Sequence, residues 1–519
     1  MSRSLGAACL AAAFSLLAWN ADAEVLTARV TGGQVEGVAS GGIAAFKGIP
    51  FAAPPVGELR WKEPQPVAAW SGLKKASAFG ASCMQDPGML QFMQAPPSTS
   101  EDCLYLNVWT PAKAASDTLP VMVWIYGGGF AAGTTASATY DGTRLAQKGV
   151  VLVSVAYRVG AFGFLAHPEL SKESGKGSGN YGLQDMIAGL QWVQDNIAAF
   201  GGDPRNVTIF GESAGGIAVS MLGASPHAKG LFAKAISESG GSFAPSRRGA
   251  EGGMNVPALA AAETAGKTFF DKLGTASLAA GRALPADKIQ GAQGPGLGTG
   301  FWPTDDGDVL PGDQYVLYGR GKFNDTPVLI GTNSDEGALF VRGGVTKAGY
   351  EQAIRAGYGE HADEILKTNP HATDADALQA SRNIFRDSAF AWQTWAWAKL
   401  QTTKGKNPAY VYYFDHRTPQ SPNGASHGDE LGYVFRNLAP AARPEDVAMA
   451  ELVSSYWTNF AKTGNPNATG LPSWPVFSVA KQEAMFFDAK SSARPLPNRS
   501  QIEALDGYYA WRREQAKGR

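Results

Sequence analysis

A serine between glycines is the residue of this chain whose surroundings most clearly predict chemistry. Residues 211–215 read Gly-Glu-Ser-Ala-Gly and fit the pattern G-x-S-x-G, with the serine at Ser213. The run Val-Thr-Ile-Phe at residues 207–210 predicts a strand, and residues 217–222 predict a helix. On such a strand–turn–helix elbow the serine hydroxyl is exposed above a sheet, where it can act as a nucleophile. The pattern therefore predicts a serine hydrolase.

A second serine fits the same pattern in a different setting. Residues 424–428 read Gly-Ala-Ser-His-Gly, with the serine at Ser426. Pro419, Pro422 and Asn423 precede it, which is typical of a loop, and no predicted strand leads into this serine. We therefore expect Ser426 to lie in a glycine-rich turn and Ser213 to be the nucleophile.

A nucleophilic serine also needs donors for the oxyanion that forms during acyl transfer. Residues 126–130 read Tyr-Gly-Gly-Gly-Phe and directly follow a predicted strand at residues 121–126. Consecutive glycines allow backbone N–H groups to approach a substrate carbonyl oxygen, because no side chain intervenes. A flexible turn without such a role is the alternative interpretation.

The acid and the base are expected after the serine, in the order serine, acid, histidine. Glu336 and Asp335 both follow a predicted strand at residues 328–331, and the residues themselves do not distinguish between them or exclude a solvated loop carboxylate. His416 lies just past a later predicted strand, and His427 lies further along the same loop. Spacing alone leaves both histidines open as the base.

Strand-like and helix-like segments alternate along the chain, which predicts an α/β fold with a mostly parallel sheet covered by helices on both faces. No internal repeat or linker divides the chain, so we expect one domain at residues 24–519. The glycine-rich stretches 240–253 and 291–300 are expected to be surface loops around the mouth of the site. The predicted strands are 121–126, 150–156, 207–210, 234–239, 328–331, 410–414 and 484–487, and the longest predicted helix is 182–196.

Composition excludes several classes of function. The 519 residues carry a net charge of −1, so the chain offers no strongly basic surface for nucleic acid. Hydrophobic residues make up 44% of the chain, which is enough for a large core. No Cys/His cluster has the spacing of metal ligands, and no phosphate-binding glycine motif follows a strand. The sequence therefore implies no metal and no organic cofactor, and the expected partner is a small-molecule ester.

The first 23 residues have the features of a signal peptide. Arg3 precedes an apolar run at residues 5–19, and Ala-Asp-Ala at residues 21–23 forms a cleavage site before Glu24. A short membrane anchor is the alternative, but the apolar run is too short to span a bilayer comfortably, and no later stretch of the mature chain is long enough. We therefore expect export of the chain, to the periplasm or the medium.

Cysteine content agrees with export. Cys9 lies within the signal peptide, which leaves Cys83 and Cys103, 20 residues apart, in the mature chain. Such a pair in an exported protein predicts one disulfide bond that closes a small loop. Two buried free thiols are the alternative.

Several segments resemble the type-B carboxylesterases, the α/β-hydrolase family that includes cholinesterases and bacterial para-nitrobenzyl esterases. The resemblance covers nearly the whole mature chain, and its most specific segments are Glu-Asp-Cys-Leu-Tyr-Leu-Asn at 101–107 and Gly-Glu-Ser-Ala-Gly-Gly at 211–216. Further matching segments are residues 45–52, the loop that contains His427, and residues 456–461.

The resemblance implies a role for individual residues and an α/β-hydrolase fold. It implies that Ser213, Glu336 and His427 form the catalytic triad, which favours Glu336 over Asp335 and His427 over His416. It further implies an oxyanion hole at Gly128, Gly129 and Ala214, supporting roles for Glu212 and Ser239, and a disulfide bond between Cys83 and Cys103.

The chain departs from the cholinesterase branch between its two mature cysteines. That branch has a tryptophan there that faces a quaternary ammonium, whereas this segment contains no tryptophan and only one aromatic residue, Phe92. Residues 291–300 also lack the bulky side chains that narrow the acyl pocket in that branch. A cation needs an aromatic face at close range, so we expect a preference for uncharged esters.

The expected activity is hydrolysis of carboxylic esters through an acyl-enzyme formed on Ser213. A lipase or an amidase is an alternative, because the same triad serves all acyl transfers. A non-catalytic adhesion protein on the same scaffold is the other alternative, but such relatives typically lose the serine or its supports, and this chain has all of them.

Overall fold

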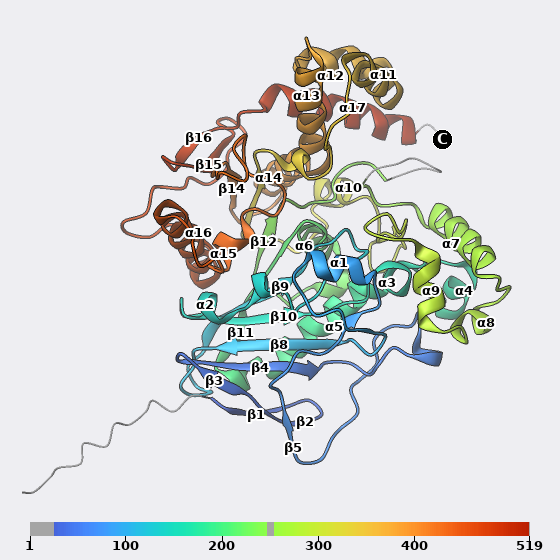
Figure 1. Ribbon diagram of the computed structural model, residues 1–519, viewed down its shortest axis with the longest axis vertical. Coiled ribbons are helices and arrows are strands. Elements are labelled where there is room, and N and C mark those ends of the chain that lie inside the picture. The colour runs from blue at the N-terminus through green and yellow to red at the C-terminus, as the bar shows by residue number, and fades with distance from the viewer. Residues whose placement is uncertain (1–24, 247–253, 518–519) are drawn as a thin grey trace, which may run out of the picture.

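One large mixed sheet organises the structure, a computed structural model that describes residues 25–246 and 254–517 (Figure 1). The predicted signal peptide, residues 1–23, lies outside the described residues. The sheet has 11 strands. From one edge to the other these are β16 (Ser492–Pro495), β15 (Glu483–Phe487), β14 (Ala409–Phe414), β13 (Val328–Asn333), β12 (Lys234–Glu238), β11 (Gly202–Glu212), β9 (Leu119–Ile125), β10 (Val151–Val155), β8 (Tyr105–Thr110), β4 (Ile43–Pro50) and β3 (Val38–Ser40).

Seven consecutive strands of the sheet, β15, β14, β13, β12, β11, β9 and β10, are parallel to one another. The antiparallel strands lie at its two edges, with β8, β4 and β3 on one side and β16 on the other. In such a sheet the carboxyl ends of the parallel strands meet at one edge, which is where α/β proteins bind ligands. The prediction of a mostly parallel α/β sheet is confirmed.

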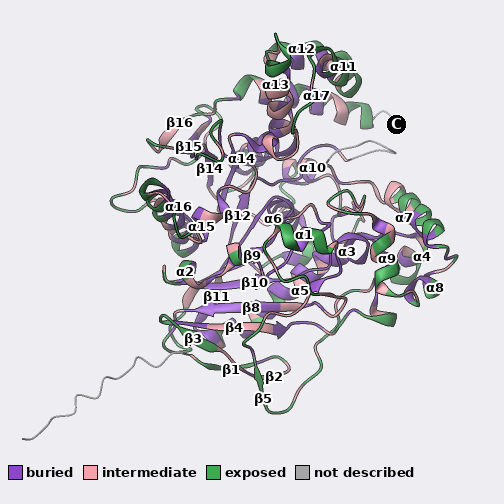
Figure 2. Ribbon diagram, in the orientation of Figure 1, coloured by how far each residue is buried: buried purple, intermediate pink, exposed green. Residues whose placement is uncertain are grey.

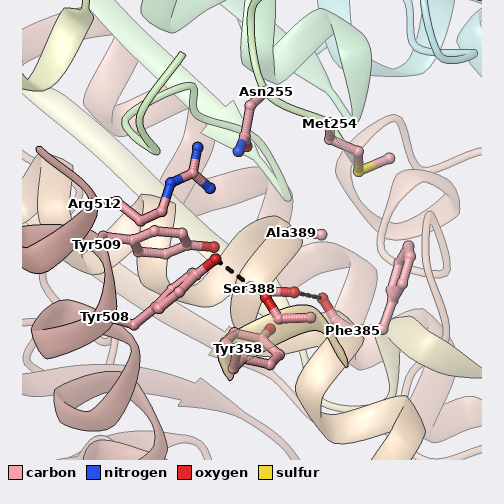
Figure 3. A pocket seen from close by; sticks show the side chains of 10 residues that line it. Met254, Asn255, Tyr358, Phe385, Ser388, Ala389, Tyr508, Tyr509 and Arg512 are labelled. Atoms are coloured by element: carbon pink, nitrogen blue, oxygen red, sulfur yellow. Dashed lines mark hydrogen bonds between the residues drawn. The ribbon is translucent and has the colours of Figure 1, made fainter. Parts of the chain in front are cut away.

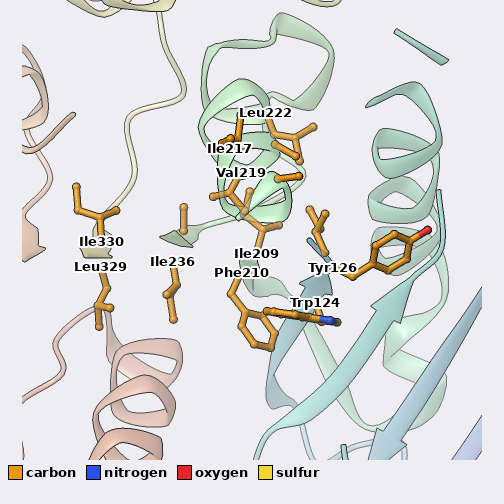
Figure 4. Packing of buried hydrophobic residues seen from close by; sticks show 14 of the residues in the cluster. Trp124, Tyr126, Ile209, Phe210, Ile217, Val219, Leu222, Ile236, Leu329 and Ile330 are labelled. Atoms are coloured by element: carbon orange, nitrogen blue, oxygen red, sulfur yellow. The ribbon is translucent and has the colours of Figure 1, made fainter. Parts of the chain in front are cut away.

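Helices cover both faces of this sheet. Ile209 and Phe210 are successive residues of β11, so their side chains point to opposite faces. Ile209 lies beneath helix α6 (Ala214–Ala224), as Figure 4 shows. On the other face Phe210 packs against Trp124, with ring centroids 4.9 Å apart, and both rings contact Phe435 at the end of α15 (Leu431–Val434). Both sets of contacts bury the middle of the sheet (Figure 2).

The remaining elements surround this core, and α11, α12, α13 and α17 gather at one end of the molecule (Figure 1). The helices are α1 (Pro87–Phe92), α2 (Thr143–Ala146), α3 (Gly160–Phe164), α4 (Pro168–Ser174), α5 (Tyr181–Asn196), α7 (Leu259–Leu273), α8 (Leu278–Arg282), α9 (Ala286–Gln293), α10 (Gln314–Gly319), α11 (Lys347–Tyr358), α12 (Ala362–Thr368), α13 (Asp374–Arg386), α14 (Trp392–Lys404), α16 (Pro444–Thr463) and α17 (Arg499–Lys517). Short strands outside the main sheet are β1 (Thr27–Val30), β2 (Gly33–Glu36), β5 (Leu73–Lys75), β6 (Ser82–Cys83) and β7 (Thr99–Ser100).

One predicted surface loop is not at the surface. Residues 240–245 are buried, because Gly240 packs directly against Gly216 of α6: a Cβ at position 240 would lie 2.3 Å from the Gly216 carbonyl carbon. Residues 247–253 of the same stretch lie outside the described residues. The other glycine-rich stretch does contain exposed residues, including Leu297, whose exposed fraction is 41%.

The predicted disulfide bond between Cys83 and Cys103 is present. It closes a loop that contains α1, and both cysteines are buried. Within the two described ranges, no helix is both long enough and apolar enough to cross a membrane.

The close approach of α6 to β9 depends on a glycine. A Cβ at Gly215 would lie 2.0 Å from the carbonyl oxygen of Ile125 and 2.8 Å from that of Tyr126. Backbone oxygens cannot move aside as a flexible side chain can. The start of α6 can therefore contact the end of β9 only where residue 215 has no side chain.

We expect Gly215→Ala to lower the free energy of unfolding by about 1–3 kcal/mol, because the extra methyl group forces α6 away from β9. Thermal or denaturant unfolding measures this loss. The matched control is Gly291→Ala in α9, where a Cβ would have no atom within 4 Å. There alanine should be neutral or stabilise the helix by up to about 1 kcal/mol. Equal stability of the two variants would contradict the packing argument.

Candidate active site

Ser213 occupies a strained turn between β11 and α6. The strand ends at Glu212 and the helix begins at Ala214. Ser213 has φ 56° and ψ −124°, a backbone conformation that residues other than glycine rarely adopt. Two hydrogen bonds hold the turn: the Ser213 N–H donates to the Glu238 carbonyl at 2.9 Å, and the Ile217 N–H donates to the Ser213 carbonyl at 2.8 Å. Strain of this kind persists only where the surroundings impose it, and it is common at active sites.

The glycines after β9 lie against this turn. A Cβ at Gly127 would lie 3.0 Å from the Ser213 Cβ, so a side chain there would crowd the serine. Gly128 and Gly129 follow with φ angles of 111° and 61°, in the region that favours glycine. Among the described residues, the N–H groups of Gly128, Gly129 and Ala214 donate no hydrogen bond to protein. These three donors are therefore available to an oxygen atom beside Ser213.

His427 and Glu336 are joined by a hydrogen bond. His427 Nδ1 donates to Glu336 Oε2 at 2.5 Å. The other carboxylate oxygen, Oε1, accepts a hydrogen bond from the Ser239 hydroxyl at 2.5 Å and one from the Asn333 N–H at 2.7 Å. Glu336 has no exposed surface. These contacts fix the orientation of the carboxylate and, through it, that of the imidazole.

Asp335 and His416, the alternatives to Glu336 and His427 in the sequence, make other contacts. Asp335 lies 3.9 Å from Arg382 Nη1 and makes no contact with either histidine. His416 Nε2 lies 2.7 Å from Asp446 Oδ1, in a buried pair at the start of α16. This pairing ties a loop to a helix and leaves His416 away from Ser213.

Ser426 lies near the site but on an ordinary turn. Its N–H donates to Asp429 Oδ2 at 2.8 Å, and its carbonyl accepts a hydrogen bond from Asn333 Nδ2 at 2.8 Å. No strand leads into it, and its φ angle is not positive. The expectation of a turn at Ser426 is therefore correct, although this residue does form part of the pocket wall.

His427 lies between two glutamates. Its Nε2 atom is 3.1 Å from Glu212 Oε1, but neither atom makes a hydrogen bond. Burial lowers the pKa of His427, yet the negative charges of Glu212 and Glu336 outweigh this effect and raise the pKa to about 9. Burial also raises the pKa of Glu212 to about 7, against the opposing effect of His427. The imidazole ring stacks on Phe390, with centroids 4.7 Å apart.

Ser213 and His427 open into the same cavity of about 500 Å³. Three segments contribute much of its apolar lining: α1 with the residue after it, the glycine-rich loop before α10, and the segment after β13. The side chains concerned are Met89, Phe92, Met93, Leu297, Leu339 and Phe340. Such a cavity suits an uncharged organic substrate of moderate size.

A second cavity has a volume of about 280 Å³. Figure 3 shows the side chains that line it. Met254 lines both cavities. Phe385 lines the second cavity and stacks on Phe340 of the first, with ring centroids 4.5 Å apart. Tyr508 and Arg512 of α17 form its far side.

Several residues of the site were not identified from the sequence. Asn333 donates hydrogen bonds to Glu336 and to the carbonyl of Ser426. Its position at the end of a predicted strand was the one feature of the sequence that could have indicated this role. Glu430 belongs to the segment around His427, but nothing in its residue type indicated burial. Glu238 and Phe390 had no sequence signal, because only the fold brings them to the site.

Comparisons with known proteins show which family the chain belongs to. The sequence model of the Carboxylesterase family matches residues 22–504. The chain is 38% identical to Fumonisin B1 esterase of Sphingopyxis macrogoltabida, over 94% of this chain and 92% of that protein. It is 36% identical to Para-nitrobenzyl esterase of Bacillus subtilis (strain 168), over 91% of this chain and 97% of that protein. A solved PNB esterase structure superposes with a TM-score of 0.80 at 34% identity, covering 92% of this chain and 99% of that one.

The match spans nearly the full length of both relatives, and the sheet has the α/β-hydrolase arrangement that the resemblance implied. We conclude that this chain belongs to the carboxylesterase family and is a carboxylic-ester hydrolase with an α/β-hydrolase fold.

Proposed function

We propose that the protein is an exported serine esterase in which Ser213, His427 and Glu336 form a catalytic triad. One observation carries the proposal: Glu336 holds His427 through Nδ1, and Nε2, which has no hydrogen-bond partner among the described residues, belongs to the cavity that Ser213 also lines. A base held in this way can accept the serine proton at Nε2.

In the proposed reaction, Ser213 Oγ attacks the ester carbonyl carbon while His427 Nε2 takes its proton. The oxyanion is stabilised by the N–H groups of Gly128, Gly129 and Ala214, the last at the positive end of the α6 dipole. His427 then gives its proton to the leaving alcohol, which leaves an acyl-enzyme on Ser213. Water, activated by the same histidine, attacks the acyl group and releases the acid.

In the described part of the chain, the Ser213 hydroxyl makes no hydrogen bond to protein, and Nε2 lies beside Glu212. Catalytic hydrogen bonds are often long or misaligned without substrate and tighten in the reacting complex. In the proposed reacting complex, the imidazole turns its Nε2 atom from Glu212 toward Ser213, whose hydroxyl lines the same cavity. The geometry is therefore compatible with the proposed roles.

We expect Ser213→Ala and His427→Ala to reduce kcat/KM by a factor on the order of 10⁴, because each removes a part that the others cannot replace. His416→Ala and Ser426→Ala are the matched controls, and both should retain most activity. Asp335→Asn should be much milder than Glu336→Gln. Steady-state kinetics with a short-chain aryl ester measure all six variants. If His416→Ala were as inactive as His427→Ala, the assignment of the base would fail.

The pH dependence should reflect the two carboxylates beside His427. Since its pKa is raised to about 9, the neutral imidazole forms only as the pH rises, and the acid limb of kcat/KM should lie above 6.5. Glu212→Gln removes one charge and should move this limb to lower pH by about one unit or more. Because folding raises the pKa of His427 from 6.5 to about 9, the protonated imidazole stabilises the folded chain in full below about pH 6.5. This contribution to the free energy of unfolding is lost as the pH rises through about 9. A limb at or below 6.5 in the wild type would argue against this account.

We propose that uncharged esters are the preferred substrates. The segment closed by the disulfide bond contributes Met89, Phe92 and Met93 to the cavity, and Phe92 has an exposed fraction of 64%, so its ring lies at the mouth and not over the substrate. Methionine packs well against irregular apolar groups but offers no aromatic face to a cation. The carboxyl groups of Glu212 and Asp429 also line the cavity and attract a cation. We therefore expect cationic esters to be hydrolysed less efficiently than neutral ones, but still hydrolysed.

A choline ester should therefore have a kcat/KM roughly threefold to thirtyfold below that of an isosteric neutral ester with the same acyl group, since a lost cation–π contact is worth about 0.5–2 kcal/mol. Paired kinetics on the two esters measure this ratio. A clear preference for the choline ester would show that another ring of the cavity, such as Phe340, faces the cation.

Export rests on the features of residues 1–23 and on the disulfide bond. The secreted protein should begin at or near Glu24 and contain no free thiol. Mass spectrometry of the intact protein, with thiol titration under denaturing but non-reducing conditions, tests both points. One thiol would mean that Cys9 is retained with the signal peptide, and two would mean that Cys83 and Cys103 are not joined.

A further inference from the structure

Three buried glutamates come together behind Ser213. Glu212 ends β11 and Glu238 ends β12, and the two are paired residues in the parallel register of these strands. Their side chains therefore project from the same face of the sheet, on backbones about 4.8 Å apart. Glu430 enters from the loop before α15, where Asn333 Nδ2 donates to its Oε2. The exposed fractions of the three glutamates are 5%, 0% and 1%.

Within the described part of the chain, each of the three carboxyl groups has one buried oxygen without a hydrogen-bond partner. These atoms are Oε1 of Glu212, Oε2 of Glu238 and Oε1 of Glu430. The other oxygen of Glu238 accepts a hydrogen bond from Trp457 Nε1 at 2.7 Å. No lysine or arginine of residues 25–246 or 254–517 forms an ion pair with these glutamates. Three buried carboxylates that share one cation, His427 beside Glu212, cannot all be ionised, so protons must be retained.

We propose that Glu212, Glu238 and Glu430 share protons as one cluster, in which Glu238 is a neutral carboxylic acid at pH 7 and directs its O–H toward the unpartnered oxygens of the other two. A carboxylic acid kept neutral by its site can serve as a hydrogen-bond donor. Glu238 does not belong to the lining of the cavity that Ser213 opens into, so it acts as a positioning residue, through Glu212, which lies beside His427. The inference deepens the proposed triad mechanism and rests on it.

The electrostatics of the three groups support this assignment. Burial raises the pKa of Glu238 to about 8, a rise that the Trp457 hydrogen bond reduces and the charge of Glu212 increases. Burial, followed by the charges of Glu212 and Glu238, raises the pKa of Glu430 well above its usual range. Glu212, with a pKa raised to about 7, is the first of the three to ionise.

The other titratable groups that face the cluster are Glu336, His427 and three phenols. Tyr157 interacts with Glu212 and stays neutral, because burial raises its pKa well above its usual value. Tyr140, from the 3₁₀ turn η2 (Ala138–Tyr140), and Tyr412 of β14 both interact electrostatically with the three glutamates. Burial raises the pKa of each phenol far above its usual value, so both stay neutral. His427 is thus the cationic partner of the cluster.

The protons retained on Glu238 and Glu430 affect the ability of His427 to act as a base. Ionised Glu238 and Glu430 would add negative charge next to Glu212, and this charge would raise the pKa of His427 beyond the value that Glu212 and Glu336 already give it. With protons retained on Glu238 and Glu430, the cluster presents a single titrating charge, that of Glu212. His427 then releases its proton as the pH rises toward about 9, and not at still higher pH.

Infrared difference spectroscopy tests the proposal directly. The spectrum of the wild type minus that of Glu238→Gln at pH 7 should contain the C=O stretching band of a protonated carboxylic acid. This band should disappear as the pH rises through about 8. Ser213→Ala should show the same band, because the band depends on the cluster and not on turnover. Absence of the band at pH 7 would overturn the proposal, whereas an active Ser213→Ala enzyme would overturn the triad instead.

Kinetics provide a readout that a purely structural role would not change. Glutamine can still accept from Trp457 and donate to the cluster, so it mimics a neutral Glu238. The ratio of kcat/KM between Glu238→Gln and wild type should stay constant within about twofold from pH 5.5 to 7.5. The ratio should then rise between pH 8 and 9. There Glu238 of the wild type ionises and adds its charge to that of Glu212, whereas glutamine stays neutral. A tenfold change of the ratio below pH 7.5 would mean that Glu238 is already ionised there.

Trp457→Phe keeps the proposal testable if Glu238→Gln does not fold. Loss of the indole N–H removes a donor that favours the ionised form of Glu238. The carboxylic-acid band should then persist to higher pH than in the wild type. A band that titrates at the same pH in both proteins would contradict the assignment to Glu238.

Discussion

The hydrogen bond between His427 and Glu336 is the interaction on which the rest of the site depends. Glu336 is fully buried and has three donors, His427, Ser239 and Asn333, each from a different segment. Removing one partner of a buried charged group leaves that group uncompensated, which is among the most costly changes a core can undergo. The carboxylate therefore fixes three segments relative to one another, and the imidazole is held in one orientation as a result.

The parallel sheet brings these segments to one edge. Ser213 follows β11, Ser239 follows β12, Asn333 ends β13, and Gly127 lies just past β9. Because neighbouring parallel strands end at the same edge of the sheet, residues that are far apart in the chain lie close together there. Glycines at the contact points permit the close approach of α6 and β9 that supports the strained turn at Ser213.

Much of this could be predicted from the sequence, since strands, glycine turns and the elbow at Ser213 leave local patterns. The choice of His427 over His416 could not, because both follow β14. Only the resemblance favoured His427, and the structure shows the physical difference, since His416 is paired with Asp446 of α16. Glu238 was missed for a related reason: a glutamate at the end of a strand is usually solvated, and only the register of β11 and β12 brings it beside Glu212.

The central claim is that Ser213 carries the acyl group during turnover. The most direct measurement is rapid acid quenching of the enzyme during hydrolysis of a slowly deacylated ester, followed by peptide mapping by mass spectrometry. The account predicts one acyl group per chain, on the peptide that contains Ser213, and none in Ser213→Ala. An acyl group on Ser426, or turnover without any covalent intermediate, would contradict it.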